Sequence, residues 1–137
     1  MKKVAVIGSG NVGATAVYYI AEKNMADVVM VDVVPGRPES IAMDFLHTSP
    51  LRGYHVSIAG ATDYAAIAGA DVVVLTAGVA RKPGMDRMDL LKTNVGIAKQ
   101  AGQAIARYAP DAVVVVVTTP LDVICTVVLR ETGFALK

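Results

Sequence analysis

A short apolar run at residues 4–7 leads directly into three glycines, Gly8, Gly10 and Gly13, with the spacing Gly-x-Gly-x-x-Gly. The first glycine of such a turn permits a tight bend, the second lets a pyrophosphate approach the backbone, and the third lets the following helix pack closely on the strand. The N–H groups and the dipole at the start of that helix favour negative charge. The turn is therefore predicted to bind the pyrophosphate of a dinucleotide.

A carboxylate at the expected distance completes this pattern. Asp32 follows Gly13 by 19 positions and ends a second apolar run. Such a carboxylate accepts hydrogen bonds from the adenosine ribose hydroxyls, and its charge repels a 2′-phosphate, which favours NAD over NADP. A glycine-rich turn with a purely structural role is the alternative, because such turns occur in many α/β proteins. The strand before the turn, the helix after it and the acid together favour a dinucleotide.

A second group of residues suited to chemistry lies in the segment 77–86, where glycine and proline predict a hinge-like loop. Arg81 lies in this loop and Arg87 directly follows it. A planar guanidinium can hold a carboxylate through two parallel charge-assisted hydrogen bonds. The alternative is a solvated basic face balanced by acids, formed by Arg81, Lys82, Arg87 and Lys92 with Asp86 and Asp89. The residues alone leave both interpretations open.

Strand and helix patterns alternate along the chain, which predicts parallel pairing with right-handed crossovers. Strands are expected at 3–7, 28–32, 55–59, 71–76 and 112–118. Helices are expected at about 12–23, 39–47, 87–108 and 121–131, with Pro50 and Gly53 breaking the second. The predicted fold class is α/β, a Rossmann-type doubly wound parallel sheet with strand order 3-2-1-4-5, in which we expect the sixth strand to be missing and nucleotide to bind at the carboxyl ends of the strands.

Length and composition narrow the functional classes. A chain of 137 residues is expected to be one domain, 1–137, with a substantial core. The net charge of +1 argues against nucleic acid or an anionic membrane as the main partner. The apolar fraction of 54% is explained by strands that are buried on both faces, and the longest apolar strand run is too short to span a bilayer.

The single cysteine and the start of the chain indicate where in the cell the protein is expected. Cys125 cannot form an internal disulfide, and its apolar neighbour Ile124 predicts a buried, inert thiol. The N-terminus enters a strand and the glycine turn directly, unlike a signal peptide. We therefore expect a cytoplasmic protein, and we expect no metal site.

The letters ARKPGMDR occupy residues 80–87, and with them the chain resembles the malate dehydrogenases of the lactate/malate dehydrogenase superfamily. The resemblance covers essentially all 137 residues, through VTTPLD at 117–122 to TGF at 132–134. It implies the nucleotide-binding half of an NAD-dependent oxidoreductase of the tricarboxylic acid cycle. In the full-length enzymes of that family, hydride passes between NAD(H) and the dicarboxylates malate and oxaloacetate.

The resemblance also implies roles for particular residues. Arg81 would select a dicarboxylate, at a position where lactate-type enzymes have an uncharged residue. Arg87 would polarise the substrate carbonyl and stabilise the alkoxide, while Asn94 and Thr119 would contact substrate and cofactor. The segment 77–86 would close over the substrate as a lid. The full set of implied cofactor-binding residues is Gly8, Ser9, Gly10, Asn11, Val12, Gly13, Asp32, Thr76, Ala77, Gly78, Asn94, Val117 and Thr119.

Two departures from the family pattern affect the expected activity. In the family, a C-terminal substrate domain carries the catalytic histidine, its partner aspartate and a further arginine. We expect that domain to be absent from residues 1–137. His47 and His55 do not match that histidine and are expected to be structural. Thr119 replaces a family asparagine and can reproduce only part of its hydrogen bonding. We expect a cis bond before Pro120, weak NAD binding and little or no turnover by this chain alone.

The sequence is compatible with several functions, and it also predicts self-association. The chain is half of a malate dehydrogenase, a minimal Rossmann cofactor-binding module without turnover, or a nucleotide-responsive or structural protein. A lactate dehydrogenase-like 2-hydroxy acid dehydrogenase is the alternative within the family, and Arg81 argues against it. The valines at 113–117 are expected to form an apolar sheet edge, so we expect self-association or a homo-oligomer unless the last helix and Phe134 cover that edge.

Overall fold

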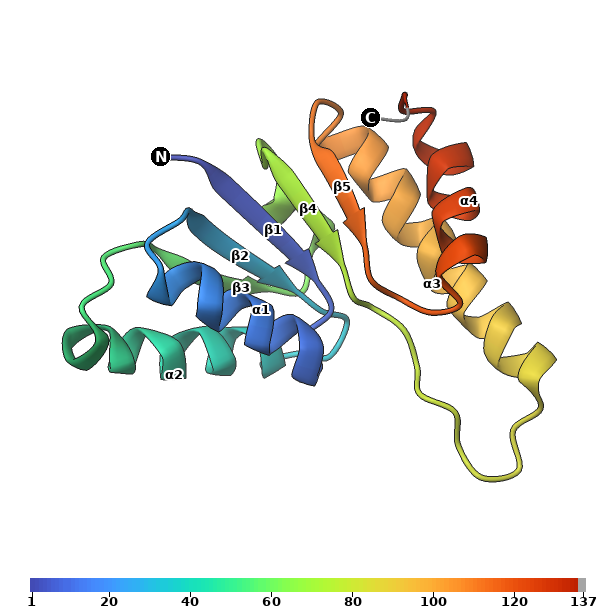
Figure 1. Cartoon of the computed structure of the whole chain (residues 1–137), viewed down its shortest axis with the longest axis horizontal. Coiled ribbons are helices and arrows are strands. Elements are labelled where there is room, and N and C mark those ends of the chain that lie inside the picture. The colour runs from blue at the N-terminus through green and yellow to red at the C-terminus, as the bar shows by residue number, and fades with distance from the viewer. Residues whose placement is uncertain (136–137) are drawn as a thin grey trace.

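The structure is a computed structural model that describes residues 1–135. All five strands are parallel and lie in the order β3-β2-β1-β4-β5, which confirms the predicted doubly wound topology (Figure 1). The strands are β1 (Lys3–Ile7), β2 (Asp27–Val31), β3 (Ile58–Ala61), β4 (Val72–Leu75) and β5 (Val113–Val116). The helices are α1 (Asn11–Glu22), α2 (Arg37–Arg52), the short 3-10 helix η1 (Tyr64–Ile67), α3 (Arg87–Tyr108) and α4 (Leu121–Thr132).

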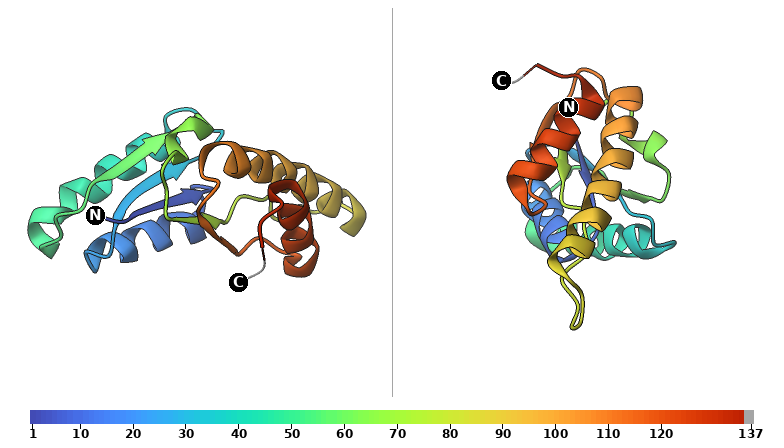
Figure 2. Two further views of the ribbon diagram at one scale, coloured as in Figure 1. Left: turned by 90° about the horizontal axis from the view of Figure 1, so that it is seen from above. Right: turned by 90° about the vertical axis from the view of Figure 1, so that its right-hand side faces the viewer.

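Helices lie on both sides of the sheet and create two hydrophobic clusters (Figure 2). On one face, α1 and α2 pack on alternate residues of β1 and β2, including Val6 and Met30. On the other face, η1, α3 and α4 pack on the intervening residues, including Ile7 and Val73. Because strands buried on both faces need apolar side chains at every position, the continuous valine and isoleucine runs follow from this layering.

The second helix and third strand differ most from the sequence expectation. Helix α2 continues through Pro50 to Arg52, whereas proline was expected to end it. Pro50 lies in the last turn, so the one intrahelical hydrogen bond that its missing N–H removes falls near the helix end, and Gly53 then closes the helix with φ of 74°. Strand β3 begins at Ile58, three residues later than expected, because Ile58 pairs with Val28 of β2.

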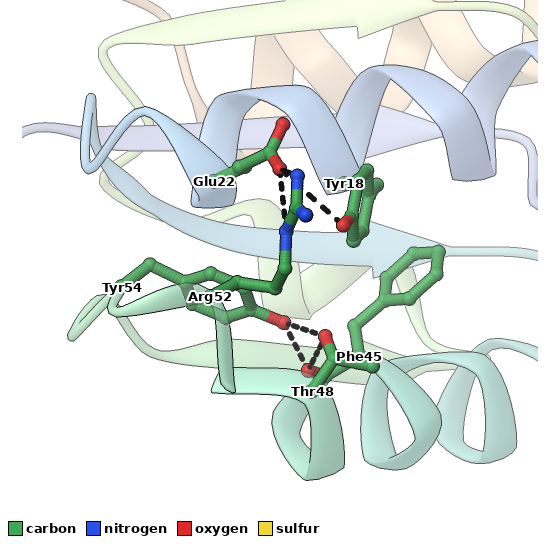
Figure 3. Close-up of polar contacts among 6 residues, drawn as sticks. All are labelled: Tyr18, Glu22, Phe45, Thr48, Arg52 and Tyr54. Atoms are coloured by element: carbon green, nitrogen blue, oxygen red, sulfur yellow. Dashed lines mark hydrogen bonds and ion pairs between the residues drawn. The ribbon is translucent and has the colours of Figure 1, made fainter. Parts of the chain in front are cut away.

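Polar contacts fasten the carboxyl end of α2 to its neighbours (Figure 3). The Nε of Arg52 donates to Oε1 of Glu22 on α1 at 2.8 Å, and the two residues form an ion pair. The hydroxyl of the buried Tyr54 contacts Oγ1 of Thr48 at 2.6 Å and donates to the carbonyl of Phe45. These contacts support the helical turn that contains Pro50.

One face of the β4–β5 half of the sheet carries no helix of the described chain (Figure 1). Val113, Val115 and Val117 on that face are 43%, 45% and 42% exposed. Phe134 packs on the opposite face with Val114 and does not cover these valines. Within residues 1–135, β5 is thus an edge strand of the sheet with exposed valines, as expected.

The cysteine expectation was wrong, because Cys125 is exposed. Helix α4 turns Ile124 and Val128 into the core, so the next position along the helix points away from it. None of the helices in the described part of the chain is long and apolar enough to cross a membrane.

Candidate cofactor-binding site

The glycine turn joins β1 to α1 with very close packing. Gly8 has φ of 110°, and a Cβ atom built on it would lie 2.7 Å from the backbone nitrogen of Ala77. A Cβ atom on Gly13 would lie 1.9 Å from the carbonyl oxygen of Gly8. Both distances are shorter than van der Waals contact, so these two positions require glycine. The expected reasons for the first and third glycines are confirmed.

The middle glycine faces open space. No protein atom lies within 4 Å of a Cβ atom built on Gly10, which is the N-cap of α1. No side chain caps this helix end, and Asn11 and Val12 at its start are exposed. The first N–H groups of α1 are consequently available to an anion. This arrangement fits the pyrophosphate of a dinucleotide.

Asp32 is held in place beside this turn. Its Oδ2 accepts hydrogen bonds from the N–H of Ser9 at 2.7 Å and from the Ser9 hydroxyl at 2.6 Å. Its Oδ1 accepts one from the N–H of Val34 at 3.1 Å. Partial burial acts to raise the pKa of Asp32, but the hydrogen bonds from Ser9 and Val34 and the nearby Arg37 outweigh it, so the pKa lies below its ordinary value. The carboxylate is therefore charged and oriented at neutral pH.

Threonine side chains tie the carboxyl ends of neighbouring strands together. Oγ1 of Thr76, which follows β4, donates to the carbonyls of Ile7 and Gly8 at 3.1 and 3.2 Å. Oγ1 of Thr118, which follows β5, donates to the carbonyl of Ala77 at 2.8 Å. Thr118 is 7% exposed. The turns after β1, β4 and β5 are thus joined into one surface.

Gly78 and Asn94 complete the surface on the β5 side. A Cβ atom on Gly78 would lie 2.8 Å from Cγ2 of Thr118 and 3.3 Å from Oδ1 of Asn94, which explains the glycine. Asn94 is 3% exposed, and its amide bonds to backbone atoms of Val79 and Thr119. Thr119 is exposed, and the peptide bond before Pro120 is cis, as expected.

The loop after β4 extends beyond the carboxyl ends of the strands before it returns to α3 (Figure 1). Arg81 and Arg87 are exposed there. Neither forms an ion pair with Asp86 or Asp89 among residues 1–135. The exposure of the two arginines fits a solvated charged face as well as guanidinium groups that bind an anionic ligand, so both interpretations stay open at this point.

The predicted site residues lie near one edge of the sheet, and the two histidines, which were expected to be structural, lie away from it. The residues near that edge follow the carboxyl ends of β1, β2, β4 and β5. His47 and His55 are exposed and lie near the opposite end, at the end of α2 and before β3. Sequence reasoning missed Thr118, whose neighbour Thr119 drew attention because it departs from the family. A buried hydroxyl at a strand end has no distinctive sequence signal.

The parallel sheet, the glycine turn at a helix N-terminus and the acid after β2 define a dinucleotide-binding domain of the Rossmann type. Residues 2–137 match the family described as lactate/malate dehydrogenase, NAD binding domain, and the chain belongs to that family. NAD is accordingly its cofactor.

Individual relatives agree with this assignment. A malate dehydrogenase of Desulforudis audaxviator is 50% identical over 132 residues, which are 96% of this chain and 43% of that protein. The apo structure of the malate dehydrogenase from Picrophilus torridus superposes with a TM-score of 0.94 at 42% identity, over 98% of this chain and 43% of that one. A lactate dehydrogenase of Cryptosporidium parvum, complexed with lactic acid and NAD, superposes with a TM-score of 0.91 at 36% identity. The match covers 98% of this chain and 42% of that one. The chain thus spans less than half the length of these relatives.

Proposed function

We propose that this chain is the nucleotide-binding half of a cytoplasmic NAD-dependent malate dehydrogenase that serves the tricarboxylic acid cycle. The loop that carries Arg81 and leads to Arg87 at the start of α3 begins where β4 ends, and Thr76 at that point is bonded to the glycine turn after β1. An anionic substrate held by the loop would therefore lie beside a dinucleotide held by the turn. This juxtaposition carries the proposal, since a domain that only bound nucleotide would have no use for the two arginines.

Each residue of the site has a role in this proposal. Asp32 binds the adenosine ribose, and the start of α1 binds the pyrophosphate. Arg81 holds the second carboxylate of malate or oxaloacetate, and Arg87 stabilises the oxygen on C2 as its charge changes. NAD supplies the hydride acceptor or donor at its nicotinamide ring. The exposed loop closes over the substrate and excludes water.

Replacement of Arg81 by glutamine tests the choice of substrate in a full-length protein that carries this domain. Loss of one charge-assisted contact of about 1.5–3 kcal/mol lowers kcat/KM for oxaloacetate by roughly 10- to 150-fold. Pyruvate lacks the second carboxylate, so its kcat/KM does not fall. The measurement is steady-state NADH oxidation with each keto acid.

Lys82→Gln is the matched control, because it removes a neighbouring exposed charge from the same loop. We expect this variant to keep the preference for oxaloacetate. An unchanged ratio of the two kcat/KM values in Arg81→Gln would show that Arg81 is not the selector. A preference of the unaltered full-length protein for pyruvate would favour the lactate dehydrogenase-like alternative.

We also propose that the 137-residue chain self-associates through the valine face of β5, defined by Val113, Val115 and Val117. A second copy can cover these side chains and pair with the open backbone of the edge strand. Exposed flat apolar edges favour such pairing, and natural sheets usually protect them. The expected result for the unaltered chain is a dimer or larger species in light scattering.

Val115→Lys places a charge in the centre of the valine face, and we expect it to shift the chain to the monomer. Val115 is already 45% exposed, so the substitution leaves the core intact. The control is Leu51→Lys on α2, which changes an 88% exposed apolar residue outside the valine face. A monodisperse monomer of the unaltered chain at high concentration, or equal effects of the two substitutions, would count against the valine face.

A further inference from the structure

The amide of Asn94 forms hydrogen bonds with backbone atoms from two different loops. Its Oδ1 accepts a hydrogen bond from the N–H of Val79 at 2.9 Å. Its Nδ2 donates to the carbonyl of Thr119 at 3.2 Å and reaches the carbonyl of Val79 at 3.5 Å. A side-chain amide offers one oxygen and two N–H groups, so little capacity remains for a ligand. With 3% of its surface exposed, Asn94 lies beneath the site surface.

The two loops that Asn94 joins define the end of the site beyond the pyrophosphate turn. Val79 lies near the start of the segment 77–86, here called the arginine loop, and Thr119 lies in the turn between β5 and α4. Asn94 itself is on α3, into which the other end of the arginine loop runs. One side chain therefore links the helix at one end of the loop, the first residues at its other end, and the neighbouring turn.

Between these attachments the arginine loop has only local support. Within the described chain, residues 80–85 make hydrogen bonds only among themselves, from the N–H of Met85 to the carbonyl of Lys82 and from Nε of Arg81 to the carbonyl of Met85. The bond between Asn94 and the N–H of Val79 is consequently the nearest point at which the loop is fixed to the domain on its N-terminal side, while at the other end the Asp86 carbonyl accepts a hydrogen bond from the N–H of Leu90. Loss of the bond to Asn94 would free the loop from Val79 onwards.

We propose that Asn94 is a positioning residue, which fixes the start of the arginine loop against the Thr119 turn and so shapes the nicotinamide and substrate end of the site. This inference rests on the proposed function, because it assigns that end of the site to the same cofactor. It differs from the role that the family resemblance implies, in which Asn94 touches cofactor and substrate directly. The adenosine end, held by Asp32 and the glycine turn, is independent of Asn94.

The test compares Asn94→Ala with the unaltered 137-residue chain in two measurements. Calorimetry gives the affinities for NADH and for ADP, which contains the adenosine end and the two phosphates but no nicotinamide. Hydrogen exchange by NMR on the ligand-free chain gives the protection of the Val79 N–H. We expect the NADH dissociation constant to rise about tenfold, the ADP constant to change less than twofold, and the Val79 N–H to exchange at least about tenfold faster.

Other outcomes overturn the inference in distinguishable ways. Weaker NADH binding with unchanged protection of Val79 would show direct contact between Asn94 and the ligand. Equal losses for NADH and ADP would show a general role in folding, and unchanged NADH binding would show no role. Failure of the unaltered chain to bind either ligand would instead contradict the proposed function.

A second variant keeps the test decisive if Asn94→Ala does not fold. Asn94→Asp preserves size and the acceptor for the Val79 N–H but removes the donor to the Thr119 carbonyl. We expect it to retain the protection of Val79 and to weaken NADH binding relative to ADP. An equal effect of Asn94→Asp on both ligands would overturn the linkage to the Thr119 turn.

Discussion

Substitution of Gly13 by alanine is expected to abolish measurable NADH binding and to destabilise the domain. The new Cβ atom would lie 1.9 Å from the carbonyl oxygen of Gly8, within the backbone of the pyrophosphate turn itself. Neither atom belongs to a flexible side chain, so α1 must move away from β1. Overpacking of this kind lowers the free energy of unfolding by about 3 kcal/mol, which for a domain of this size lowers Tm by roughly 10 °C. Thermal unfolding and calorimetry measure the two effects.

Gly96→Ala provides the matched control on α3. No atom lies within 4 Å of a Cβ atom built there, and the residue is helical. Alanine in a helix interior is favoured over glycine by about 0.5–1 kcal/mol, so this variant should be slightly more stable and bind NADH normally. If Gly13→Ala also kept its Tm and its affinity, the close contact between α1 and β1 would not be needed for the turn.

Substitution of Asp32 by alanine should weaken NADH binding by roughly 10- to 150-fold, the equivalent of about 1.5–3 kcal/mol for charge-assisted hydrogen bonds to the ribose. NADPH binding should improve relative to NADH, because the charge that repels a 2′-phosphate is gone. Ser9 loses the partner of its hydroxyl and N–H, so a modest loss of stability accompanies the change. Parallel calorimetric titrations with the two cofactors measure the change in preference.

The low pKa of Asp32 also sets the pH range of its contribution. Its pKa in the folded domain lies below the ordinary carboxyl value of 3.8, so folding favours the charged form. The resulting stability is present above the ordinary value and is lost as pH falls through the lower, folded value. Asp111→Ala, which removes an exposed carboxylate before β5, is the control and should leave cofactor preference unchanged. An unchanged preference in Asp32→Ala would show that another residue selects the cofactor.

Much of the fold could be predicted because its signals are local. Uninterrupted valine runs predicted buried parallel strands, and the alternation with helical segments predicted the strand order. The bounds of α3 agree with the expectation, since its amphipathic pattern is long and starts after a clear loop. The glycine turn and Asp32 were recognisable because phosphate and ribose binding impose a fixed spacing on the sequence.

The remaining features depend on contacts between distant residues. A Cβ atom on Gly60 would lie 2.2 Å from the carbonyl of Pro38, so the position of β3 is set by close packing against α2. The carboxyl end of α2, past Pro50, is likewise supported by a contact with a distant residue, the hydrogen bond from Arg52 to Glu22 of α1. Asn94 illustrates the same limit at the site, because its hydrogen bonds to two loops have no counterpart in local sequence.

Titration of NADH into the purified 137-residue chain, followed by calorimetry, tests the central conclusion that NAD is the cofactor of this domain. Heat is a suitable signal because the chain has no tryptophan. Circular dichroism on the same sample establishes that the chain is folded. Saturable binding of NADH that exceeds the binding of NADPH is the predicted result. A folded chain that binds neither cofactor, or both equally, would contradict it.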